Sequence, residues 1–599
     1  MNKKPIWIAG VTRGHNAGVC LMKDGEIIFS IEEERLTRRK YDGGPLASIL
    51  KIKEYTDKLD YMVIAHTQTL AESAGKLDYT GEDVYSGLAR KMGLINSHYG
   101  PENDPQVIDM AMFHHKMHAS LAFFRSGFEE AVAVIIDGAG TFFPLEINGE
   151  HMTVWETESI YKCEYPTTIK TLHKTVGTRN MLVGAYVKDW DAGAWEPGKQ
   201  FDISVSDRAG IVKAYEAVTE YCGWSSIEAG KTMGLFPYGK ENNSFPDIMD
   251  KNDLPIPITN RNLIVPRYPN GAVVNANMYN YLNQHESEND LTYLQNRRDL
   301  AYAVQTESQQ AAASLIKHAV ALSGCKNVVI SGGYGLNCVA NYFYLNELKD
   351  LGINIYVEPV SNDAGTAMGA AYIWHHNITG STKVCPRVDN VYLGPQYNYT
   401  DSAINETATK YGAEVSTANH NDIIDLLEAK NIVAMFQGRS ENGPRALGNR
   451  SILFDPRFED GKDFVNSVKH REYFRPFAGS ILEEHVHEWF DLRGMDSSPT
   501  MMYAVNCQPG IAEKIPSIIH IDGTCRIQTV TTDQNKHYYD LIKTFYDRTG
   551  CPILFNTSFN LGGEPLVETL SDALWTLQQS EIEYLYLPEY GKLIKIANK

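Results

Sequence analysis

Three histidines fall within five positions of the stretch MFHHKMHA, residues 112–119. His114 and His118 are four positions apart, so in a helix both imidazoles leave the same face, one turn from each other. This spacing is typical of metal ligands, but a zinc-protease helix also needs a glutamate between the two histidines, and the intervening residues HKM include no carboxylate. The stretch therefore predicts either a metal site of another kind or a helix whose histidines are satisfied by buried hydrogen bonds.

Two aspartates are candidate partners for these histidines, because each is expected at the end of a strand. Asp137 follows the apolar run AVAVII, and Asp363 follows an apolar run and precedes the small residues AGTA, which can open a helix. Mixed imidazole and carboxylate ligands suit Fe(II), Mn(II) or Zn(II). Spacing along the chain leaves open whether His114, His118, Asp137 and Asp363 converge.

The elements that must position these residues begin with an internal repeat. Residues 5–31 and 131–155 each read as a strand, a glycine-containing turn, a second strand, an Asp-Gly or Asn-Gly hairpin turn and a third strand. Glycine-rich turns after apolar strands expose N–H groups that can cradle phosphate, and the second turn supplies Gly138 and Gly140. Two such turns are typical of the actin and sugar-kinase type of ATPase, although hairpins with glycine turns also occur in proteins without a ligand.

A further glycine turn lies later in the chain. Gly332 and Gly333 separate the apolar run VVIS from a helix pattern that carries Asn337 and Asn341. Such a glycine pair between strand and helix lets the backbone approach a nucleotide closely. Together with the repeat, this turn predicts a nucleotide-binding cleft.

Basic and amide side chains gather in the C-terminal part of the chain. After Trp374 the sequence becomes polar and turn-rich, which predicts a linker over 376–400. Guanidinium groups match phosphate oxygens, so the basic residues beyond it predict a site for a small polyanion, namely ATP. For the three arginines that share one loop, a salt-bridged surface is the alternative. The candidates are Arg439, Arg445, Arg450, Lys469, Arg471, Arg475, Arg526, Asn556 and Ser558.

Composition limits the class of protein. A chain of 599 residues is long enough for about three to four domains or lobes. The 55 basic and 74 acidic residues give a net charge of −19, which opposes nonspecific binding to nucleic acid but leaves room for a nucleic acid substrate held by a local patch. The nine cysteines form no CxxC pair, so we expect a reducing, cytoplasmic setting. No apolar window approaches the roughly 18 residues of a membrane helix, so no membrane partner is expected.

Several long motifs, taken in chain order, resemble those of the O-carbamoyltransferase family of the NodU, CmcH and TobZ type. The motifs are HHKMHA with SLAFFRSGF, IIDGAG, EAGKTMGLFPYG, SGGYGLN and SNDAGTAMGAA. The resemblance implies an α/β fold with an actin-like (ASKHA, Kae1-like) two-lobed domain over 1–375, a linker over 376–400, and a YrdC-like domain over 401–599. Insertions near 165–205 and 245–300 are expected to shape the acceptor pocket.

The resemblance also implies roles for individual residues. Iron would be held by His114, His118, Asp137 and Asp363. The implied catalytic residues are His15, Lys40, Lys231 and Asn337, while Asn341 and the glycines of the turns join the nucleotide-binding set. His15 is placed either to act as the base for the acceptor hydroxyl or to bond to its own turn. Lys231 would neutralise the adenylate phosphate, and Lys40 would meet phosphate or pair with the glutamates that precede it.

The implied reaction has two stages. In the YrdC-like domain, carbamoyl phosphate and ATP with Mg give carbamoyl adenylate, pyrophosphate and phosphate. In the Kae1-like domain the carbamoyl group passes to an acceptor hydroxyl, by default that of a small molecule or natural product. A homodimer is left open.

Four other functions are alternatives. The same chemistry on a 5-hydroxymethylpyrimidine of DNA needs a basic groove, for which Lys170, Lys174, Arg179, Lys188, Arg261 and Arg267 are candidates. Threonylcarbamoyl transfer to tRNA needs a threonine site and a basic face, and the sequence indicates neither. A nonenzymatic ATP switch with an actin-like fold would have no use for the arginine-rich pocket. For carbamoyl transfer to a cysteine, as in HypF, the sequence lacks the acylphosphatase and zinc-finger modules of that family. Aromatic candidates for the acceptor pocket are Trp190, Trp195, Tyr268, Tyr279 and Tyr281.

Overall fold

Two units make up the chain, and a short N-terminal segment belongs to the second of them. The computed structural model describes residues 4–67, 83–96, 104–147, 149–180, 185–193, 196–250, 258–267, 270–275 and 295–596. Unit 1 comprises 1–28 and 43–388, and unit 2 comprises 29–42 and 389–599. Across the described ranges, no helix has the length and apolar character needed to cross a membrane.

The segment 29–42 is anchored inside unit 2 by its arginines. Arg35 donates from Nη2 to the Gly443 carbonyl oxygen at 2.7 Å, and Arg38 donates from Nη1 to the Leu566 carbonyl oxygen at 2.5 Å. The predicted domains 1–375 and 401–599 did not include this segment in the C-terminal unit. Lys40 therefore lies in unit 2, whereas His15 lies in unit 1.

The first lobe of unit 1 is a five-stranded sheet in the order β3-β2-β1-β4-β5. β1 runs antiparallel to β2 and parallel to β4, and β4 runs parallel to β5. The elements of this lobe are β1 Trp7–Thr12, β2 Gly18–Lys23, β3 Glu26–Glu32, β4 Tyr61–Ile64, β5 Val107–Asp109, α2 Leu46–Ile52 and α3 Ser86–Lys91. The short helix α1, Glu33–Thr37, lies in the segment that joins unit 2.

The second lobe repeats this order. Its eight-stranded sheet contains the run β9-β8-β6-β14-β15, with β8 antiparallel to β6 and with β14 parallel to both β6 and β15. β11 and β10 extend the sheet beyond β9, and β7 pairs with β8. The strands are β6 Glu130–Ile136, β7 Phe142–Ile147, β8 Glu150–Glu164, β9 Thr168–Thr178, β10 Ala185–Asp191, β11 Gln200–Ser206, β14 Asn327–Ser331 and β15 Asn354–Val357.

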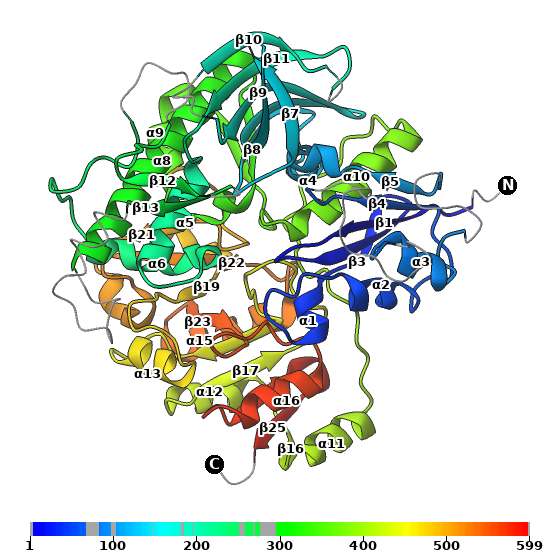
Figure 1. Cartoon of the computed structure of the whole chain (residues 1–599). Helices are drawn as coiled ribbons and strands as arrows, with labels where there is room; N and C mark the ends of the chain where they lie inside the picture. The colour runs from blue at the N-terminus through cyan, green and yellow to red at the C-terminus, as the bar shows by residue number, and fades with distance from the viewer. Residues whose placement is uncertain are drawn as a thin grey trace. The chain divides into compact units, whose positions relative to one another are not determined.

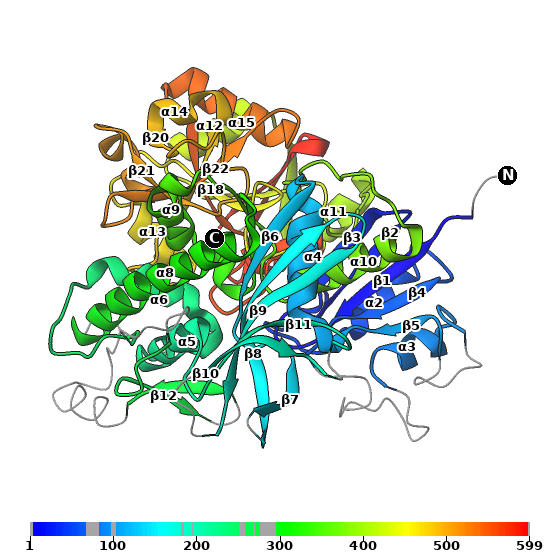
Figure 2. The ribbon, with the colours of Figure 1, turned by 90° about the horizontal axis from the view of Figure 1, so that it is seen from above.

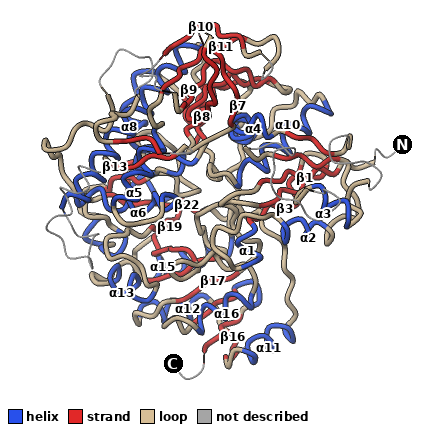
Figure 3. Tube along the Cα trace, in the orientation of Figure 1, coloured by secondary structure: helices blue, strands red, loops and turns tan. Residues whose placement is uncertain are grey.

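The duplicated strand order confirms the predicted fold class of unit 1. In each lobe the first strand pairs with an antiparallel hairpin strand on one side and with a parallel strand on the other, which is the actin-like arrangement. The first strand of each sequence repeat, β1 or β6, therefore holds the same place in its lobe, but its antiparallel neighbour is β2 in the first lobe and β8, rather than β7, in the second. The remaining elements of the second lobe are α5 Ile211–Tyr221, α6 Ala229–Leu235, β12 Ile264–Arg267, β13 Gly271–Val274, α8 Gln295–Ser323 and α9 Cys338–Glu347; Figure 3 separates these helices from the strands.

Two helices connect the lobes of unit 1. α4, His114–Ser126, and α10, Ala364–Thr379, lie side by side in both ribbon views (Figures 1 and 2), and they pack against each other. α10 also packs on β1, while α4 packs on β6 and β14. Glycine allows the closest approaches, because an ideal Cβ at Gly369 would lie 1.9 Å from the Met117 carbonyl oxygen.

His173 is buried where β9 meets α8. Its Nε2 is 3.1 Å from the Ser204 hydroxyl, and its ring centroid is 5.3 Å from that of His318. Burial, followed by the neighbouring His318, lowers the pKa of His173 to about 3. In an unfolded chain the same imidazole has a pKa of about 6.5.

This difference predicts that stability falls in mild acid. Below about pH 6.5 the unfolded chain takes up a proton that folded His173 refuses, so its contribution costs about 1.4 kcal/mol per pH unit. His173→Gln keeps a partner for Ser204 and removes the titration, so its Tm should vary less with pH in thermal melts. The exposed His151, with 82% of its side chain accessible, supplies the control variant His151→Gln. Parallel wild-type and His173→Gln profiles would contradict the prediction.

Unit 2 is built on one ten-stranded sheet in the order β16-β25-β24-β17-β18-β23-β19-β22-β21-β20. Its strands are β16 Ala413–Thr417, β17 Val433–Phe436, β18 Arg450–Phe454, β19 Ala478–Leu482, β20 Phe490–Asp491, β21 Ala504–Cys507, β22 Thr524–Val530, β23 Ile553–Ser558, β24 Tyr584–Leu587 and β25 Lys592–Ile596. Its helices are α11 Asp401–Lys410, α12 His420–Glu428, α13 Gly461–Val468, α14 Val486–Trp489, α15 Lys536–Thr549 and α16 Leu570–Gln578.

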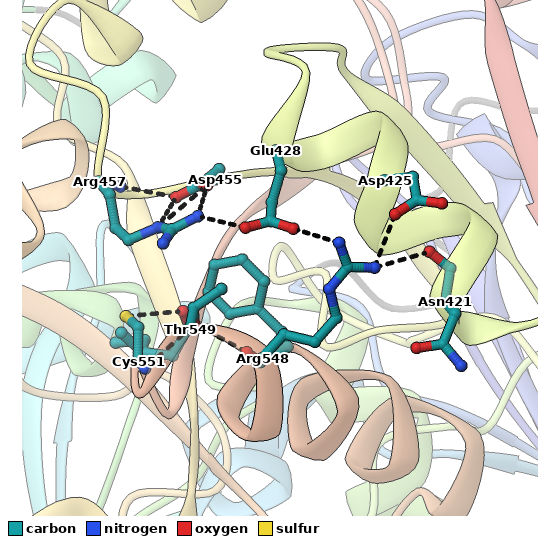
Figure 4. Close-up of polar contacts among 10 residues, drawn as sticks. Asn421, Asp425, Glu428, Asp455, Arg457, Arg548, Thr549 and Cys551 are labelled. Carbon is teal, nitrogen blue, oxygen red and sulfur yellow. Dashed lines mark hydrogen bonds and ion pairs between the residues drawn. The ribbon is translucent and has the colours of Figure 1, made fainter.

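An ion-pair network ties two helices of unit 2 together. Arg548 on α15 donates to Asp425 at 2.7 Å and to Glu428 at 2.6 Å, both on α12 (Figure 4). Glu428 also accepts from Arg457 at 3.3 Å, and Arg457 in turn forms a two-pronged pair with the buried Asp455. Both arginines therefore have acidic partners within unit 2.

Candidate functional site

Four side chains of unit 1 converge as a potential metal site. His114 and His118 lie on α4, Asp137 follows β6, and Asp363 immediately precedes α10. Their ligand atoms all lie within 4.8 Å of one another. Nε2 of His118 is 3.5 Å from Oδ1 of Asp363 and 3.9 Å from Oδ2 of Asp137, and Nε2 of His114 is 3.6 Å from each carboxylate.

The donor set fits a divalent cation. The Nε2 atoms of His114 and His118 are buried and have no hydrogen-bond partner among the described residues. Their Nδ1 atoms face the Ala65 carbonyl oxygen at 3.1 Å and the Ser331 hydroxyl at 3.3 Å, which turns both Nε2 atoms toward the carboxylates. Ligands about 2.1 Å from a tetrahedral metal are about 3.4 Å apart, close to the distances found here.

Charge in the cluster is complementary even without a cation. Burial disfavours an ionised carboxylate, yet the neighbouring His114 and His118 imidazoles hold the pKa of Asp363 well below its usual range. Asp137 and Asp363 conversely raise the pKa of His114 well above that of a free imidazole, despite its burial. Buried imidazole and carboxylate groups of this kind are expected ligands of Fe(II), Mn(II) or Zn(II).

The glycine turns hold the metal ligands in place. The Gly333 N–H donates to Oδ1 of Asp137 at 2.9 Å, so this turn, expected to face a nucleotide, contacts a ligand carboxylate. Gly332 has a φ of +90°, and a Cβ there would lie 2.4 Å from the Ile136 carbonyl oxygen. A Cβ at Gly140 would lie 2.4 Å from Oε2 of Glu156. Gly140 and Gly332 therefore permit close packing, and their nucleotide contacts stay a prediction.

Close packing of α4 and α10 predicts a sensitive glycine. Gly369→Ala must push α10 away from Met117, the neighbour of His118, at a cost of about 1–3 kcal/mol. We expect lower stability in chemical denaturation and weaker metal binding. Gly230→Ala in α6 is the matched control, because its Cβ meets open space, and its stability should be unchanged or higher by up to about 1 kcal/mol. Equal effects of the two substitutions would contradict this account.

The other predicted residues of unit 1 have different surroundings. His15 is exposed in the first glycine turn. Lys231 pairs with Glu228 at 2.8 Å. The Asn337 amide exchanges hydrogen bonds of 3.0 and 3.2 Å with Gln305 and caps α9, while Asn341 donates to the Gly335 carbonyl oxygen at 2.8 Å. Both asparagines therefore hold the turn that follows β14.

Polar residues that the sequence analysis missed lie beside the metal ligands. A Cβ at Gly138 would lie 3.0 Å from Oε1 of Glu216 and 3.5 Å from Nζ of Lys213, and these two side chains form an ion pair of 2.7 Å on α5. Half-buried His66 lies just after β4, and burial, followed by His114 and Arg13, lowers its pKa to about 3. The sequence analysis missed Lys213 and Glu216 because a lysine and a glutamate three positions apart on a helix are also the usual pattern of a surface ion pair.

Unit 2 contains a cluster of mutually repelling cations. We name Lys469, Arg471, Arg475 and Arg526 the cation cluster. Burial, then Arg471 and Arg475, lowers the pKa of Lys469 well below its usual value. Burial, then Arg475 and Arg526, does the same to Arg471. Lys469 also contacts the Ser558 carbonyl oxygen on β23, and Arg471 reaches the Thr557 hydroxyl at 3.5 Å. Such a cluster is an expected site for a polyanion.

Two arginines of the predicted anion site have structural partners instead. Arg450 is fully buried, donates to the carbonyl oxygens of Gln437 at 2.6 Å and Glu568 at 3.1 Å, and lies 3.8 Å from the Phe436 ring centroid. Arg439 donates to the carbonyl oxygens of Leu393 and Gly394 at 2.8 and 2.6 Å. We therefore leave both out of the proposed binding site.

The loop between these arginines is folded around a buried carboxylate. Oε1 of Glu441 accepts from the N–H groups of Leu447 at 2.6 Å and Asn449 at 2.9 Å. This loop carries Arg445. Asn556 is buried in β23 and donates to the Ser480 hydroxyl at 3.0 Å, and Ser558 ends the same strand. Their roles toward ATP and carbamoyl phosphate stay predictions.

Lys40 is paired within unit 2. Its ammonium lies 2.9 Å from Oε1 of Glu34, and Oε2 of the same glutamate accepts from the Tyr41 N–H at 2.9 Å. The sequence analysis gave phosphate or a preceding glutamate as the partner of Lys40, and in the structure Lys40 pairs with the glutamate. A role toward phosphate would require Lys40 to exchange that partner.

The candidate acceptor residues are only partly described. Trp195, Tyr268, Tyr279 and Tyr281 lie outside the described residues, and Trp190 packs edge to face on Phe201 at 5.4 Å. For a nucleic acid groove, Lys174 is buried against Glu156, while Arg261 and Arg267 pair with Asp207 and Glu220 at 2.6 and 2.9 Å. Lys170, Arg179 and Lys188 are exposed. Three of the six proposed groove cations therefore have acidic partners.

Comparisons with known proteins give two family matches and several full-length relatives. A family model described as Carbamoyltransferase N-terminus matches residues 102–372, and one described as Carbamoyltransferase C-terminus matches 424–592. Nodulation protein NolNO of Sinorhizobium fredii is 29% identical, over 96% of this chain and 78% of its own length. Uncharacterized protein sll1178 of Synechocystis is 30% identical, over 96% and 94%.

Weaker or shorter matches accompany these. Nodulation protein U of Rhizobium tropici is 34% identical over 40% of each chain. Among solved structures, full-length HypF in a phosphate- and nucleotide-bound form covers 63% of this chain and 47% of its own, with 13% identity and a TM-score of 0.35. That structural similarity is too low to bear on fold or function.

Proposed function

Since the chain belongs to the carbamoyltransferase family and is an enzyme that transfers carbamoyl groups, we propose that it is an ATP-dependent O-carbamoyltransferase working through carbamoyl adenylate. The observation that carries this proposal is the cation cluster of unit 2. Burial and then neighbouring cations lower the pKa of Lys469 and of Arg471. A bound polyanion would offset that repulsion, and both ATP and carbamoyl phosphate are polyanions.

Adenylate formation is assigned to unit 2. Hydrolysis of carbamoyl phosphate releases phosphate and leaves carbamate, whose oxygen attacks the α-phosphorus of MgATP and displaces pyrophosphate. Lys469, Arg471, Arg475 and Arg526 would bind the triphosphate and offset the charge that develops on the leaving pyrophosphate. Arg445, Asn556 and Ser558 are proposed to orient the nucleotide and the carbamoyl group.

Transfer is assigned to unit 1. The acceptor hydroxyl attacks the carbamoyl carbon, the bond from that carbon to the adenylate oxygen breaks, and AMP leaves. A divalent cation held by His114, His118, Asp137 and Asp363 would supply Lewis-acid stabilisation of charge on the carbamoyl oxygen. His15, exposed in its turn, would take the proton of the hydroxyl. Lys231 would exchange Glu228 for the adenylate phosphate.

The acceptor is proposed to be a small hydroxylated molecule. The buried or paired state of Lys174, Arg261 and Arg267 removes half of the cations considered for a nucleic acid groove. A hydroxymethylpyrimidine in DNA is therefore the alternative acceptor, and it is included in the test below.

The test follows both half-reactions with the full chain. Protein loaded with Fe(II) is given MgATP and carbamoyl phosphate labelled in its carbamoyl carbon, with and without a panel of hydroxylated acceptors that includes hydroxymethylcytosine DNA. We expect slow pyrophosphate release without an acceptor and faster release with the correct one, which gains the label. Absence of pyrophosphate under every condition would overturn the adenylate mechanism and leave the family assignment intact.

A further inference from the structure

We infer that the buried ion pair of Glu156 and Lys174 is a positioning device that sets the geometry of the metal ligands in unit 1. This inference rests on the proposed function only in treating the four-ligand cluster as a metal site. Neither residue belongs to that cluster. Their side chains lie on β8 and β9, with exposed fractions of 0% and 1%.

Burial and charge act against each other in this pair, because burial lowers the pKa of Lys174 although the Glu156 carboxylate lies beside it. Burial disfavours an ionised carboxylate, yet the nearby Lys174 ammonium lowers the pKa of Glu156 to about 2. Isolated buried ion pairs contribute little net stability, because desolvation offsets their attraction. Such a pair instead fixes the positions of its neighbours, because each buried charged group needs further hydrogen bonds from the groups around it.

Glu156 fixes the loop that carries Asp137. Its Oε2 accepts from the Thr141 N–H at 2.9 Å, and its carbonyl oxygen accepts from the Gly140 N–H at 3.0 Å. The Thr141 hydroxyl donates to the Ala111 carbonyl oxygen at 2.7 Å, just before α4 begins. Several anchors of the loop 137–141 thus involve Glu156 or Thr141, beside those of Asp137 itself, whose N–H donates to the Thr157 carbonyl oxygen at 3.1 Å and whose Oδ1 accepts from the Gly333 N–H.

Lys174 fixes the helix that carries the histidine ligands. Its ammonium donates to the Tyr161 hydroxyl at 2.7 Å and to the Ser159 hydroxyl at 3.4 Å. The same Ser159 hydroxyl lies 2.8 Å from Nδ1 of His115. His115 is buried on α4 between the two ligands of that helix, so its hydrogen bond opposes rotation of α4 about its axis.

One ion pair therefore governs both sides of the metal site. The loop with Asp137 and the helix with His114 and His118 come from different elements, and each is tied to one partner of the pair. His115, the second histidine of HHKMH, thereby has a role, since it connects the metal-binding helix to Lys174 through Ser159. Asp363, on the other side of the cluster, is not part of this network.

The test measures metal binding without any substrate. Lys174→Met leaves an unpaired buried carboxylate, and Glu156→Gln leaves an unpaired buried ammonium. Each is expected to weaken Co(II) binding about 10- to 100-fold, the usual effect of losing an outer partner of a metal site, and to change the Co(II) absorption spectrum. The double variant Glu156→Gln/Lys174→Met leaves no unpaired charge and should recover much of the affinity. Lys174→Arg, which keeps the charge, should stay nearest to wild type.

A matched control separates positioning from general stability. Arg90 and Asp104 form an equally buried pair of 3.0 Å in the first lobe, with exposed fractions of 4% and 0%. Asp104→Asn should lower Tm and leave Co(II) affinity and spectrum unchanged. If Lys174→Met does not fold, Lys174→Arg and the double variant still give the comparison.

Two results would overturn the inference. One is a folded Lys174→Met or Glu156→Gln protein that binds Co(II) like wild type with an unchanged spectrum. The other is a double variant that binds more weakly than both single variants, because the two residues would then act independently. Pyrophosphate release, assigned to unit 2, should be the same in all variants, so failure of the adenylate mechanism is seen separately from failure of this inference.

Discussion

Replacing His118 by alanine is expected to abolish carbamoyl transfer, while pyrophosphate release without an acceptor continues at the wild-type rate. The Nε2 atom of His118 faces both carboxylates of the cluster, 3.5 Å from Asp363 and 3.9 Å from Asp137, so its loss leaves three ligands. Metal catalysis supplies several kcal/mol of charge stabilisation, and each 1.4 kcal/mol is tenfold in rate, so transfer should fall at least about a thousandfold. The proposed site of adenylate formation lies in unit 2, which the change does not touch.

The measurement combines metal content with the two half-reactions. We expect substoichiometric metal in His118→Ala, pyrophosphate release without transfer, and free label as the adenylate hydrolyses. His151→Ala is the control, because His151 is exposed and is not one of the four ligands. A His118→Ala protein with full metal content and transfer within about tenfold of wild type would exclude His118 as a ligand.

The metal cluster is the part of the site that sequence patterns could indicate. The spacing of His114 and His118 fixes their shared helix face, and apolar runs before Asp137 and Asp363 predict strand ends. Convergence required more, namely that β6 and β14 lie side by side and that α10 starts beside α4. The duplicated strand order supplies that arrangement, and the sequence repeat indicated only its first strand in each lobe, β1 and β6, with the turn that follows.

The direction of a charged side chain was not predictable in the same way. Arg445 and Arg450 share one loop, yet Arg450 turns inward to backbone carbonyls and to Phe436 because it begins the buried strand β18. The sequence analysis names Lys174 as a candidate for a nucleic acid groove, but its side chain is buried against Glu156. A local pattern around Lys174 does not reveal this partner, because Glu156 lies on another strand, β8. That the segment 29–42 belongs to unit 2 likewise depends on contacts of Arg35 and Arg38 with residues far along the chain, which a local sequence pattern cannot predict.

Replacing Arg471 by methionine should raise the stability of the ligand-free protein and nearly abolish pyrophosphate release. Arg471 is buried beside Arg475 and Arg526, and all three carry like charge. A methionine of similar length ends that repulsion, and exchanging poorly compensated buried charge for an apolar side chain is often stabilising by about 1–4 kcal/mol. The contact of Arg471 with the Phe477 ring, 4.7 Å away, is worth about 1 kcal/mol and offsets part of the gain.

Lys469 adds a dependence on pH with a defined sign. Its pKa is lowered in the folded protein, so over the interval below its usual value of about 10.4 the unfolded chain binds more protons. Wild-type stability without ligand should therefore rise with pH in the alkaline range. In Arg471→Met the pKa of Lys469 moves back toward normal, and this rise should become smaller.

An arginine that binds an anion differs from a structural arginine in the effects of its substitution. Replacing the first should raise the stability of the ligand-free protein and lower activity, whereas replacing the second should lower stability. We expect pyrophosphate release to fall about 100- to 1,000-fold in Arg471→Met, and the rise in Tm that ATP and carbamoyl phosphate give the wild type to disappear. Arg457→Met is the control, because Arg457 pairs with the buried Asp455 and its loss leaves an uncompensated carboxylate (Figure 4). That variant should lose stability and keep its rate per folded molecule. If Arg471→Met instead loses stability and retains its rate, the cation cluster is a structural feature and adenylate formation must be sought elsewhere in the chain.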